Sequence, residues 1–228
     1  MDKMQDCGSC DRGSIPRGGT IHNLFFVAES FPMPRIPIKD LKKDIQINVT
    51  LRGTPFTFHS TWGLFSPEKI DEGTTSLINN VSVKETNTIL DLGCGYGALG
   101  IPLAKLAPKG IVHMIDRDFV AVEYARKNAL LNGVKNAKTY LSNGFDQIPE
   151  NTRFQTIVSN LPAKISKEFF WILFEEARKH LTPNGELYVV TISGLRRFVE
   201  RNFKTIFGNY ELLASKGTYF VAKAVNHS

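Results

Sequence analysis

Apolar and polar positions alternate with different periods in different parts of the chain. Residues 44–51 and 56–59 alternate apolar and polar side chains with a period of two, and Arg52-Gly53-Thr54 lies between them. This period is typical of strands that bury one face, and a short glycine-containing break joins antiparallel neighbours. We therefore predict a β-hairpin over residues 44–60.

From about residue 68 onward, short apolar runs alternate with longer stretches of helical periodicity. The predicted strands cover residues 88–92, 110–116, 138–141, 155–159 and 186–191. The predicted helices cover residues 98–107, 119–132, 167–180 and 194–207. A second hairpin is predicted at residues 211–222, turning at Lys216-Gly217. This order predicts an α/β fold: a Rossmann-like, doubly wound, mostly parallel sheet with a C-terminal antiparallel hairpin.

Residues 1–43 differ from the rest of the chain. They carry several glycines and four prolines, Pro16, Pro32, Pro34 and Pro37. We predict an irregular arm with one short ordered segment at Ile21–Ala28, followed by a single domain over residues 44–228. Cys7 and Cys10 have the spacing of half a zinc site, but no second Cys/His pair follows at finger spacing. We therefore predict no metal site.

Composition excludes several classes of protein. The chain has 228 residues, of which 42% are hydrophobic and 22% charged, which excludes a disordered or collagen-like chain. No apolar run reaches the roughly 20 residues of a membrane-spanning helix, and no secretory signal is evident. We expect a cytoplasmic protein with no membrane partner. The net charge of +6 suits a polyanion such as RNA and leaves other partners open.

A glycine-rich segment, Asp91-Leu92-Gly93-Cys94-Gly95-Tyr96-Gly97, follows a predicted strand and precedes a predicted helix. Glycines there permit positive φ angles and let a ligand approach the backbone closely. The N-terminus of the following helix favours a carboxylate or a phosphate. Gly93, Gly95 and Ala98 also match the dinucleotide fingerprint G-x-G-x-x-G/A, so the loop alone leaves a nicotinamide cofactor open.

Two carboxylates help to separate these interpretations. Asp91 precedes the glycines, where its charge would repel a pyrophosphate but suits the ammonium or sulfonium of S-adenosylmethionine (SAM). Asp116 ends the next strand and can accept hydrogen bonds from two ribose hydroxyls, as either cofactor would require. The alternatives are structural: Asp91 as a turn or capping residue, and Asp116 as the cap of the helix from Phe119. Asp118 is the better candidate for that cap.

The tetrapeptide Asn160-Leu161-Pro162-Ala163 follows the fourth strand of the α/β region. Ligands of doubly wound sheets bind outside the carboxyl ends of the strands, which places Asn160 beside the glycine loop. Its side-chain oxygen can accept a hydrogen bond from a substrate N–H, and Pro162 favours an extended Leu161 whose carbonyl points the same way. Two acceptors can hold an exocyclic amine. Asn160, Leu161 and Pro162 are therefore the candidate catalytic residues, with an ordinary turn as the alternative.

These residues, in this order, resemble the class I SAM-dependent methyltransferases. A second segment is more specific: Trp62-Gly63-Leu64-Phe65-Ser66, then Asp71, Gly73 and Thr74. It is similar to the Gly-x-Phe-Ser…Asp-x-Gly segment of the small-domain methyltransferases of the RsmC type, which methylate the guanine exocyclic amine of ribosomal RNA. The resemblance covers about residues 44–225 and fits compact archaeal single-domain members best. It implies SAM as the cofactor and RNA, either rRNA or tRNA, as the partner.

The resemblance also implies roles for individual residues. Asp91 and Gly93–Gly97 would hold the methionine moiety, and Asp116 the ribose. Asn143 stands where an Asp usually contacts the adenine amine, and an Asn oxygen can accept the same bond. The expected cofactor-binding set is Phe65, Thr74, Asp91, Gly93, Cys94, Gly95, Gly97, Asp116, Arg117, Asn143, Gly144 and Asn160.

The chain departs from the family at the tetrapeptide, which is usually Asn-Pro-Pro-aromatic. Ala163 removes an aromatic surface for the target ring, and stacking on such a surface is worth about 1–3 kcal/mol per base. Phe145, Phe65 and Trp62 are candidates to replace it, or they are plain core residues. The Asn-Leu-Pro form also resembles tRNA guanine-N1 methyltransferases.

Three further questions stay open at this stage. The substrate can instead be a small molecule or a protein amide, or the chain can be a non-catalytic SAM- or RNA-binding module. Both a monomer and a homodimer fit the sequence. Basic residues near the tetrapeptide and on the last helix suit a phosphate backbone or a solvated face: Lys164, Lys167, Arg196, Arg197, Arg201 and Lys204.

Overall fold

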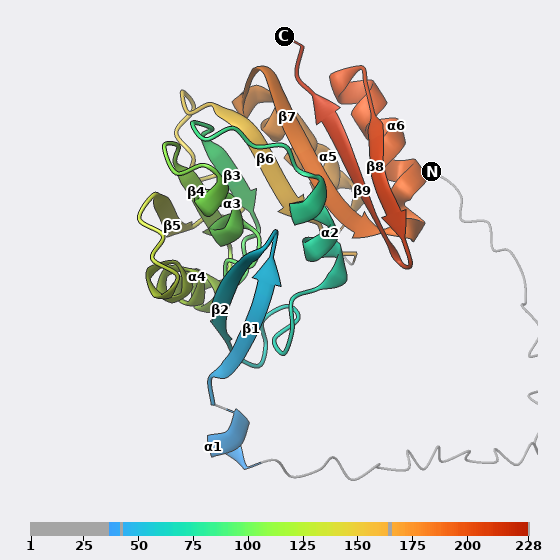
Figure 1. Cartoon of the computed structure of the whole chain (residues 1–228). Helices are drawn as coiled ribbons and strands as arrows, with labels where there is room; N and C mark the ends of the chain where they lie inside the picture. Colours follow the sequence, from blue (N-terminus) through green and yellow to red (C-terminus); the bar gives the residue numbers. More distant parts are fainter. Residues whose placement is uncertain (1–36, 42, 164–165, 228) are drawn as a thin grey trace, which may run out of the picture. The chain divides into compact units, whose positions relative to one another are not determined.

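The computed structural model describes residues 37–41, 43–163 and 166–227, which belong to one compact unit (Figure 1). The short helix α1 (Ile38–Leu41) precedes the first strand. The segment Ile21–Ala28 and the Cys7–Cys10 pair lie outside the described residues, so the predictions made for them stay predictions.

A seven-stranded sheet forms the centre of this unit, in the order β5-β4-β3-β6-β7-β9-β8. Its strands are β3 (Ile89–Leu92), β4 (Val112–Asp116), β5 (Ala137–Leu141), β6 (Phe154–Asn160), β7 (Leu181–Ile192), β8 (Glu211–Lys216) and β9 (Tyr219–Val225). The first five are parallel, and β9 runs antiparallel to both β7 and β8. This confirms the predicted doubly wound sheet with its terminal hairpin. The chain reverses its direction of winding between β3 and β6, the position where such sheets bind ligands.

Helices cover both faces of the sheet (Figure 1). They are α2 (Glu72–Asn80), α3 (Gly100–Leu106), α4 (Phe119–Leu131), α5 (Lys167–His180), the 3₁₀ turn η1 (Ser193–Leu195) and α6 (Arg196–Phe207). One core cluster joins α2, α3 and α4 to the sheet, and a second joins α5 and α6 to its other face. The second cluster is rich in aromatic rings: Phe170, Phe174 and Phe203 are nearly inaccessible to solvent.

The predicted N-terminal hairpin consists of β1 (Ile45–Leu51) and β2 (Thr54–Ser60), paired to each other and separate from the main sheet. Asn128 of α4 and Asn132, which directly follows that helix, bind the free edge of β2. The side chain of Asn128 both accepts from the His59 N–H (2.7 Å) and donates to the His59 carbonyl (2.8 Å), and Asn132 pairs with Thr57 in the same way. Positions four residues apart share one helix face, so the two amides replace a neighbouring strand.

Two elements differ from the prediction. The helix α2 was not predicted, because its sequence has a polar majority and its residues stood out only as a motif. Strand β7 begins five residues before its predicted start at residue 186. The extra residues include Pro183 and Gly185. They are bound to the segment after β9, where the Asn226 carbonyl accepts from the Asn184 N–H at 2.6 Å. A bulge in the pairing of β6 with β7 accommodates them.

Gly110 precedes β4 where the chain packs tightly against the loop before β3. A Cβ at this position would lie 1.9 Å from the carbonyl oxygen of Asn87, a backbone atom that cannot move independently. We expect Gly110→Ala to lower the free energy of unfolding by about 3 kcal/mol, the upper range for overpacking. Urea unfolding measures this, with Gly194→Ala as control, because a Cβ there meets only Ile192 Cδ1 at 4.0 Å. Equal stabilities of the two variants would contradict the prediction.

Candidate active site at the carboxyl ends of β3 and β6

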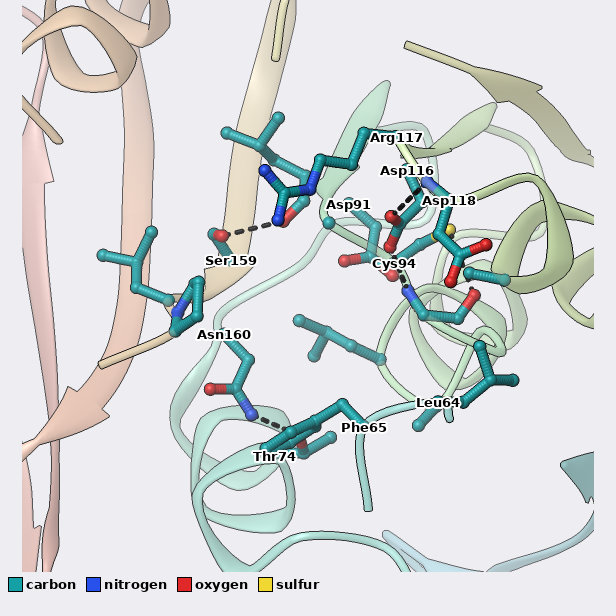
Figure 2. A pocket seen from close by; sticks show the side chains of 18 of the residues that line it. Leu64, Phe65, Thr74, Asp91, Cys94, Asp116, Arg117, Asp118, Ser159 and Asn160 are labelled. Atoms are coloured by element: carbon teal, nitrogen blue, oxygen red, sulfur yellow. Dashed lines mark hydrogen bonds between the residues drawn. The ribbon is translucent and has the colours of Figure 1, made fainter. Parts of the chain in front are cut away.

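A cavity of about 520 Å³ opens where the winding of the sheet reverses (Figure 2). It brings together thirteen of the predicted site residues: Phe65, Thr74, Asp91, Gly93, Cys94, Gly95, Asp116, Arg117, Asn143, Gly144, Asn160, Leu161 and Pro162. Gly97 does not line it. A Cβ on Gly97 would lie 2.7 Å from Ile101 Cδ1, and its φ is +90°, so this glycine shapes the turn into α3.

The glycine loop is held by backbone hydrogen bonds and by Asp116. Gly93 and Cys94 both donate to the Ile115 carbonyl, at 2.9 and 2.8 Å. The Asp116 carboxylate accepts from the N–H groups of Gly95 (2.9 Å) and Asp118 (3.0 Å). Positive φ angles at Gly93 (+76°) and Gly95 (+53°) are ones that side chains rarely adopt. The loop therefore approaches the end of β4 closely enough for one carboxylate to order it.

Asp91 lies at the base of this loop and is 1% exposed. Its Oδ2 accepts from the Gly100 N–H at 2.7 Å and so caps the start of α3. The pKa of Asp91 is raised to about 7, chiefly by burial and also by the nearby charge of Asp116, although the bond from Gly100 acts in the opposite direction. Asp91 can cap α3 and also bind a ligand in the cavity, because a carboxylate can accept more than one hydrogen bond.

Asp118 caps α4, as predicted, by accepting from the Val120 N–H at 2.8 Å. The Asp116 carboxylate, which was the alternative candidate for that cap, faces the cavity and the glycine loop instead. Asn143 and Arg117 are exposed at the rim, where Asn143 donates to Asp146 at 3.3 Å. The Asn143 nitrogen is thus used by Asp146, whereas the amide oxygen can accept a hydrogen bond from a ligand.

Asn160, at the end of β6, has its amide orientation fixed by two contacts. Its Nδ2 donates to Asp71 Oδ2 and to Thr74 Oγ1, each at 2.9 Å. Figure 2 shows the nitrogen directed at Thr74 and the oxygen on the opposite side of the amide. The oxygen is thereby available as an acceptor.

Leu161 is held more firmly than the sequence indicated. Its N–H donates to the Val190 carbonyl at 2.8 Å, and its own carbonyl accepts from the Thr191 hydroxyl at 3.0 Å. A carbonyl oxygen carries two lone pairs, so this bond leaves capacity for one more donor. Pro162 and Ala163 follow as exposed residues at the mouth of the cavity.

The three aromatic candidates separate clearly. Phe145 is 7% exposed and stacks on His180 within the core, with ring centroids 5.1 Å apart. Trp62 is 48% exposed and does not line the cavity. Phe65 is 62% exposed and does line it (Figure 2). The segment that carries Phe65 is tied to the glycine loop, because the Tyr96 hydroxyl donates to the Ser66 carbonyl at 3.2 Å.

Sequence reasoning missed several lining residues. Asp71 entered only as part of a motif, and Tyr219, Phe169 and Ile192 were not singled out, although all four line the cavity. Tyr219 lies beside Asp71, and this carboxylate raises the pKa of the tyrosine. The Asp71-x-Gly73-Thr74 spacing was the one available signal, since Asp71 caps α2 by accepting from the Thr74 N–H at 2.9 Å.

In the part of the chain that the structure describes, no three His, Cys, Asp or Glu side chains lie close enough together to hold a metal ion. Within the same residues, no helix has the length and apolar character needed to cross a membrane.

Comparisons with known proteins agree with this geometry. The chain is 34% identical over 177 residues to the "uncharacterized protein YbxB" of Bacillus subtilis, covering 76% of this chain and 88% of that protein. It is 30% identical over 182 residues to ribosomal RNA large subunit methyltransferase G of Cronobacter sakazakii, covering 77% of this chain and 48% of the relative. This chain thus spans about half the length of that methyltransferase.

Among solved structures, the Thermus thermophilus 16S rRNA N2 G1207 methyltransferase, in complex with AdoMet and guanosine, superposes with a TM-score of 0.74. It shares 26% identity, and the match covers 85% of this chain and 52% of that one. The family model for the methyltransferase small domain matches residues 55–223. These findings confirm the resemblance predicted from the sequence, and the chain belongs to the methyltransferase small domain family.

Proposed function

We propose that this protein is a SAM-dependent methyltransferase that acts on the exocyclic amine of a guanine in RNA. The observation that carries the proposal is the fixed amide of Asn160, whose nitrogen is bound by Asp71 and Thr74 and whose oxygen is left to accept. It lies in one cavity with the glycine loop. The methyltransferases of Cronobacter sakazakii and Thermus thermophilus described above act on ribosomal RNA, which supports the same substrate class here.

The cavity residues fit SAM in charge and in hydrogen bonding. Asp91 can accept from the ammonium group, and Asp116 from the ribose hydroxyls at the end of β4. The Asn143 oxygen can accept from the adenine amine. These are the acceptors that a cationic nucleoside requires, whereas the pyrophosphate of a dinucleotide would be repelled by the carboxylate of Asp91.

Catalysis in this cavity depends on alignment more than on acid–base chemistry. When bound, SAM supplies a methyl group already activated by its sulfonium. The Asn160 side-chain oxygen and the Leu161 carbonyl accept hydrogen bonds from the two N–H groups of the target amine and so direct its lone pair toward that methyl group. Positioning of this kind can supply several kcal/mol of the barrier. The amine loses a proton to solvent after it has become cationic.

Labelled SAM incubated with separate pools of RNA, protein and small molecules tests the proposed function. We expect label in the RNA pool, recovered after digestion as N2-methylguanosine. Label in the small-molecule or protein pool alone would overturn the RNA assignment. No label in any pool, together with SAM binding, would favour a non-catalytic module.

Phe65 is proposed to stack on the target ring in place of the aromatic residue absent at Ala163. We expect Phe65→Ala to lower kcat/KM for RNA by about 5- to 100-fold, which corresponds to the loss of one base–aromatic stack. Trp62→Ala is the matched control, because this ring is also exposed but does not line the cavity. The two variants should differ by at least fivefold; equal losses would refute the stacking role.

The basic residues at the start of α6 are proposed to contact RNA phosphates. Helix α6 follows the carboxyl end of β7, the sheet edge that carries the cavity, and Arg196 and Arg197 are exposed there. We expect their double replacement by alanine to weaken RNA binding and to reduce the slope of log K against log salt by about 1.5, since each phosphate contact contributes 0.7–0.9.

The control for this prediction is Lys135→Ala with Arg153→Ala. These exposed residues precede β5 and β6, so they lie at the opposite edge of the sheet. The control pair removes the same charge and should leave the salt slope unchanged. If both pairs reduce the slope equally, the effect is one of net charge and the assigned surface is wrong.

A further inference from the structure

We propose that Asp71 is the positioning residue of the methyl-acceptor site, fixing the Asn160 amide and placing a negative charge behind it. This inference rests on the function proposed above and deepens it. It begins with a contact between residues 89 positions apart in the sequence, Asn160 Nδ2 to Asp71 Oδ2 at 2.9 Å. Asp71 also lines the cavity, and its proposed role is exerted through Asn160.

The two hydrogens of the Asn160 amide have separate acceptors. One points at Asp71 Oδ2 and the other at Thr74 Oγ1, both 2.9 Å from the nitrogen. An ionised carboxylate can only accept hydrogen bonds. A flipped amide would therefore place its oxygen against a carboxylate oxygen, and the contact would be repulsive. Asp71 thus selects the rotamer in which Oδ1 serves the target amine.

Asp71 is itself held in place by its neighbours. Its Oδ2 also accepts from the Thr74 N–H at 2.9 Å as the cap of α2, and Tyr219 lies beside the same side chain. Gly73 allows this close packing, because a Cβ there would lie 2.8 Å from Asp71 Oδ2 and 3.0 Å from Tyr219 Cδ1. Asp71 is only 9% exposed, so its charge is weakly screened by water.

The charge has a direct use in the proposed reaction. The target nitrogen forms a bond to the methyl carbon as the carbon–sulfur bond breaks, and the positive charge passes from sulfur to that nitrogen. One proton then leaves the nitrogen for solvent. A carboxylate bound to the amide nitrogen polarises the amide and makes its oxygen a stronger acceptor for the N–H that gains positive charge. Asp71 therefore favours the transition state over the neutral amine.

Two variants separate the charge from the helix cap. Asp71→Asn keeps a good N-cap residue and an oxygen for Asn160, and removes only the charge. Asp71→Ala removes both. We expect kcat to fall about 10-fold for Asp71→Asn and about 30-fold for Asp71→Ala, within the range for a lost bond to a charged group. In an Asn160→Ala background, neither change should lower kcat by more than twofold. Additive losses in that background would overturn the proposal.

A second measurement does not depend on activity. The side-chain amide of Asn160, assigned by its absence in Asn160→Ala, is followed in ¹H–¹⁵N spectra. Asp71→Ala should shift one of its two proton resonances and accelerate exchange of that proton with water. Asp118→Ala removes the equivalent cap of α4 and should leave both resonances unchanged.

The two measurements distinguish the failure of each proposal. If wild-type protein places no label on RNA, the proposed function fails, and the spectra alone decide the role of Asp71. If RNA is labelled but the Asn160 resonances are the same in Asp71→Ala and wild type, the positioning role is wrong and the proposed function stands.

Discussion

Asn160→Ala is expected to lower kcat by about 100- to 1,000-fold, the range for removing one preorganised group that stabilises charge in a transition state. The variant loses the oxygen that accepts from the target amine. It should bind SAM with an affinity within about threefold of the wild type, because the glycine loop and both Asp91 and Asp116 are unchanged. Single-turnover methylation of RNA and isothermal titration calorimetry with SAM measure the two quantities.

Asn160→Asp provides the sharper comparison. It keeps an oxygen at the same position, but its carboxylate would meet the Asp71 carboxylate where Asn160 now donates at 2.9 Å. Like charges at this distance repel, so the new side chain must rotate away or take up a proton. We expect it to be as impaired as Asn160→Ala. Activity above one-tenth of the wild type in either variant would exclude the proposed role of the amide.

The alternation of strands and helices was predictable because buried parallel strands and amphipathic helices differ in period and length. The same holds for the glycine loop, since Gly93, Gly95 and Gly97 directly follow a predicted strand and precede a predicted helix. Thirteen predicted residues line one cavity because the topology of a doubly wound sheet places the ends of β3, β4 and β6 side by side. These features depend on local pattern together with a general rule of topology.

The contacts that orient the site were not predictable in this way. Asn160 meets Asp71 across 89 positions of sequence, and Tyr219 reaches Asp71 from the far antiparallel strand β9. No local period encodes such pairs. The sequence also did not reveal that one residue can serve both structure and site. Asp91 and Leu161 line the cavity, and each also accepts a structural hydrogen bond, from Gly100 and from Thr191 respectively. The structural and functional interpretations of Asp91 were therefore compatible rather than exclusive.

The buried carboxyl of Asp91 makes SAM affinity depend on pH. Its pKa is raised to about 7 in the folded protein, mainly by burial, from an ordinary value of 3.8. A cationic group bound beside it favours the ionised form, so binding releases a proton. The affinity should therefore rise between pH 5 and pH 7, by up to tenfold per pH unit, and level off above that range. Calorimetry in buffers of different ionisation enthalpy measures both the affinity and the released proton.

Asp91→Asn separates this charge from the helix cap, because an amide oxygen can still accept from the Gly100 N–H. SAM affinity at pH 7.5 should fall about 10- to 100-fold, as for the loss of a bond to a charged group, and its rise between pH 5 and pH 7 should disappear. A variant that keeps the wild-type pH dependence would show that the dependence arises elsewhere.

Stability should change in the opposite direction from affinity. In the unfolded chain Asp91 ionises near pH 4, whereas in the folded protein it holds its proton until about pH 7. Its contribution to the free energy of unfolding therefore falls as the pH rises from 4 to 7. Asp91→Asn removes this loss, so the ligand-free variant should melt at or above the wild-type temperature at pH 7.5. If the variant is less stable and binds SAM more weakly, the carboxylate serves chiefly as the cap of α3. If the variant is more stable and binds SAM more weakly, the Asp91 charge serves ligand binding and lowers the stability of the fold.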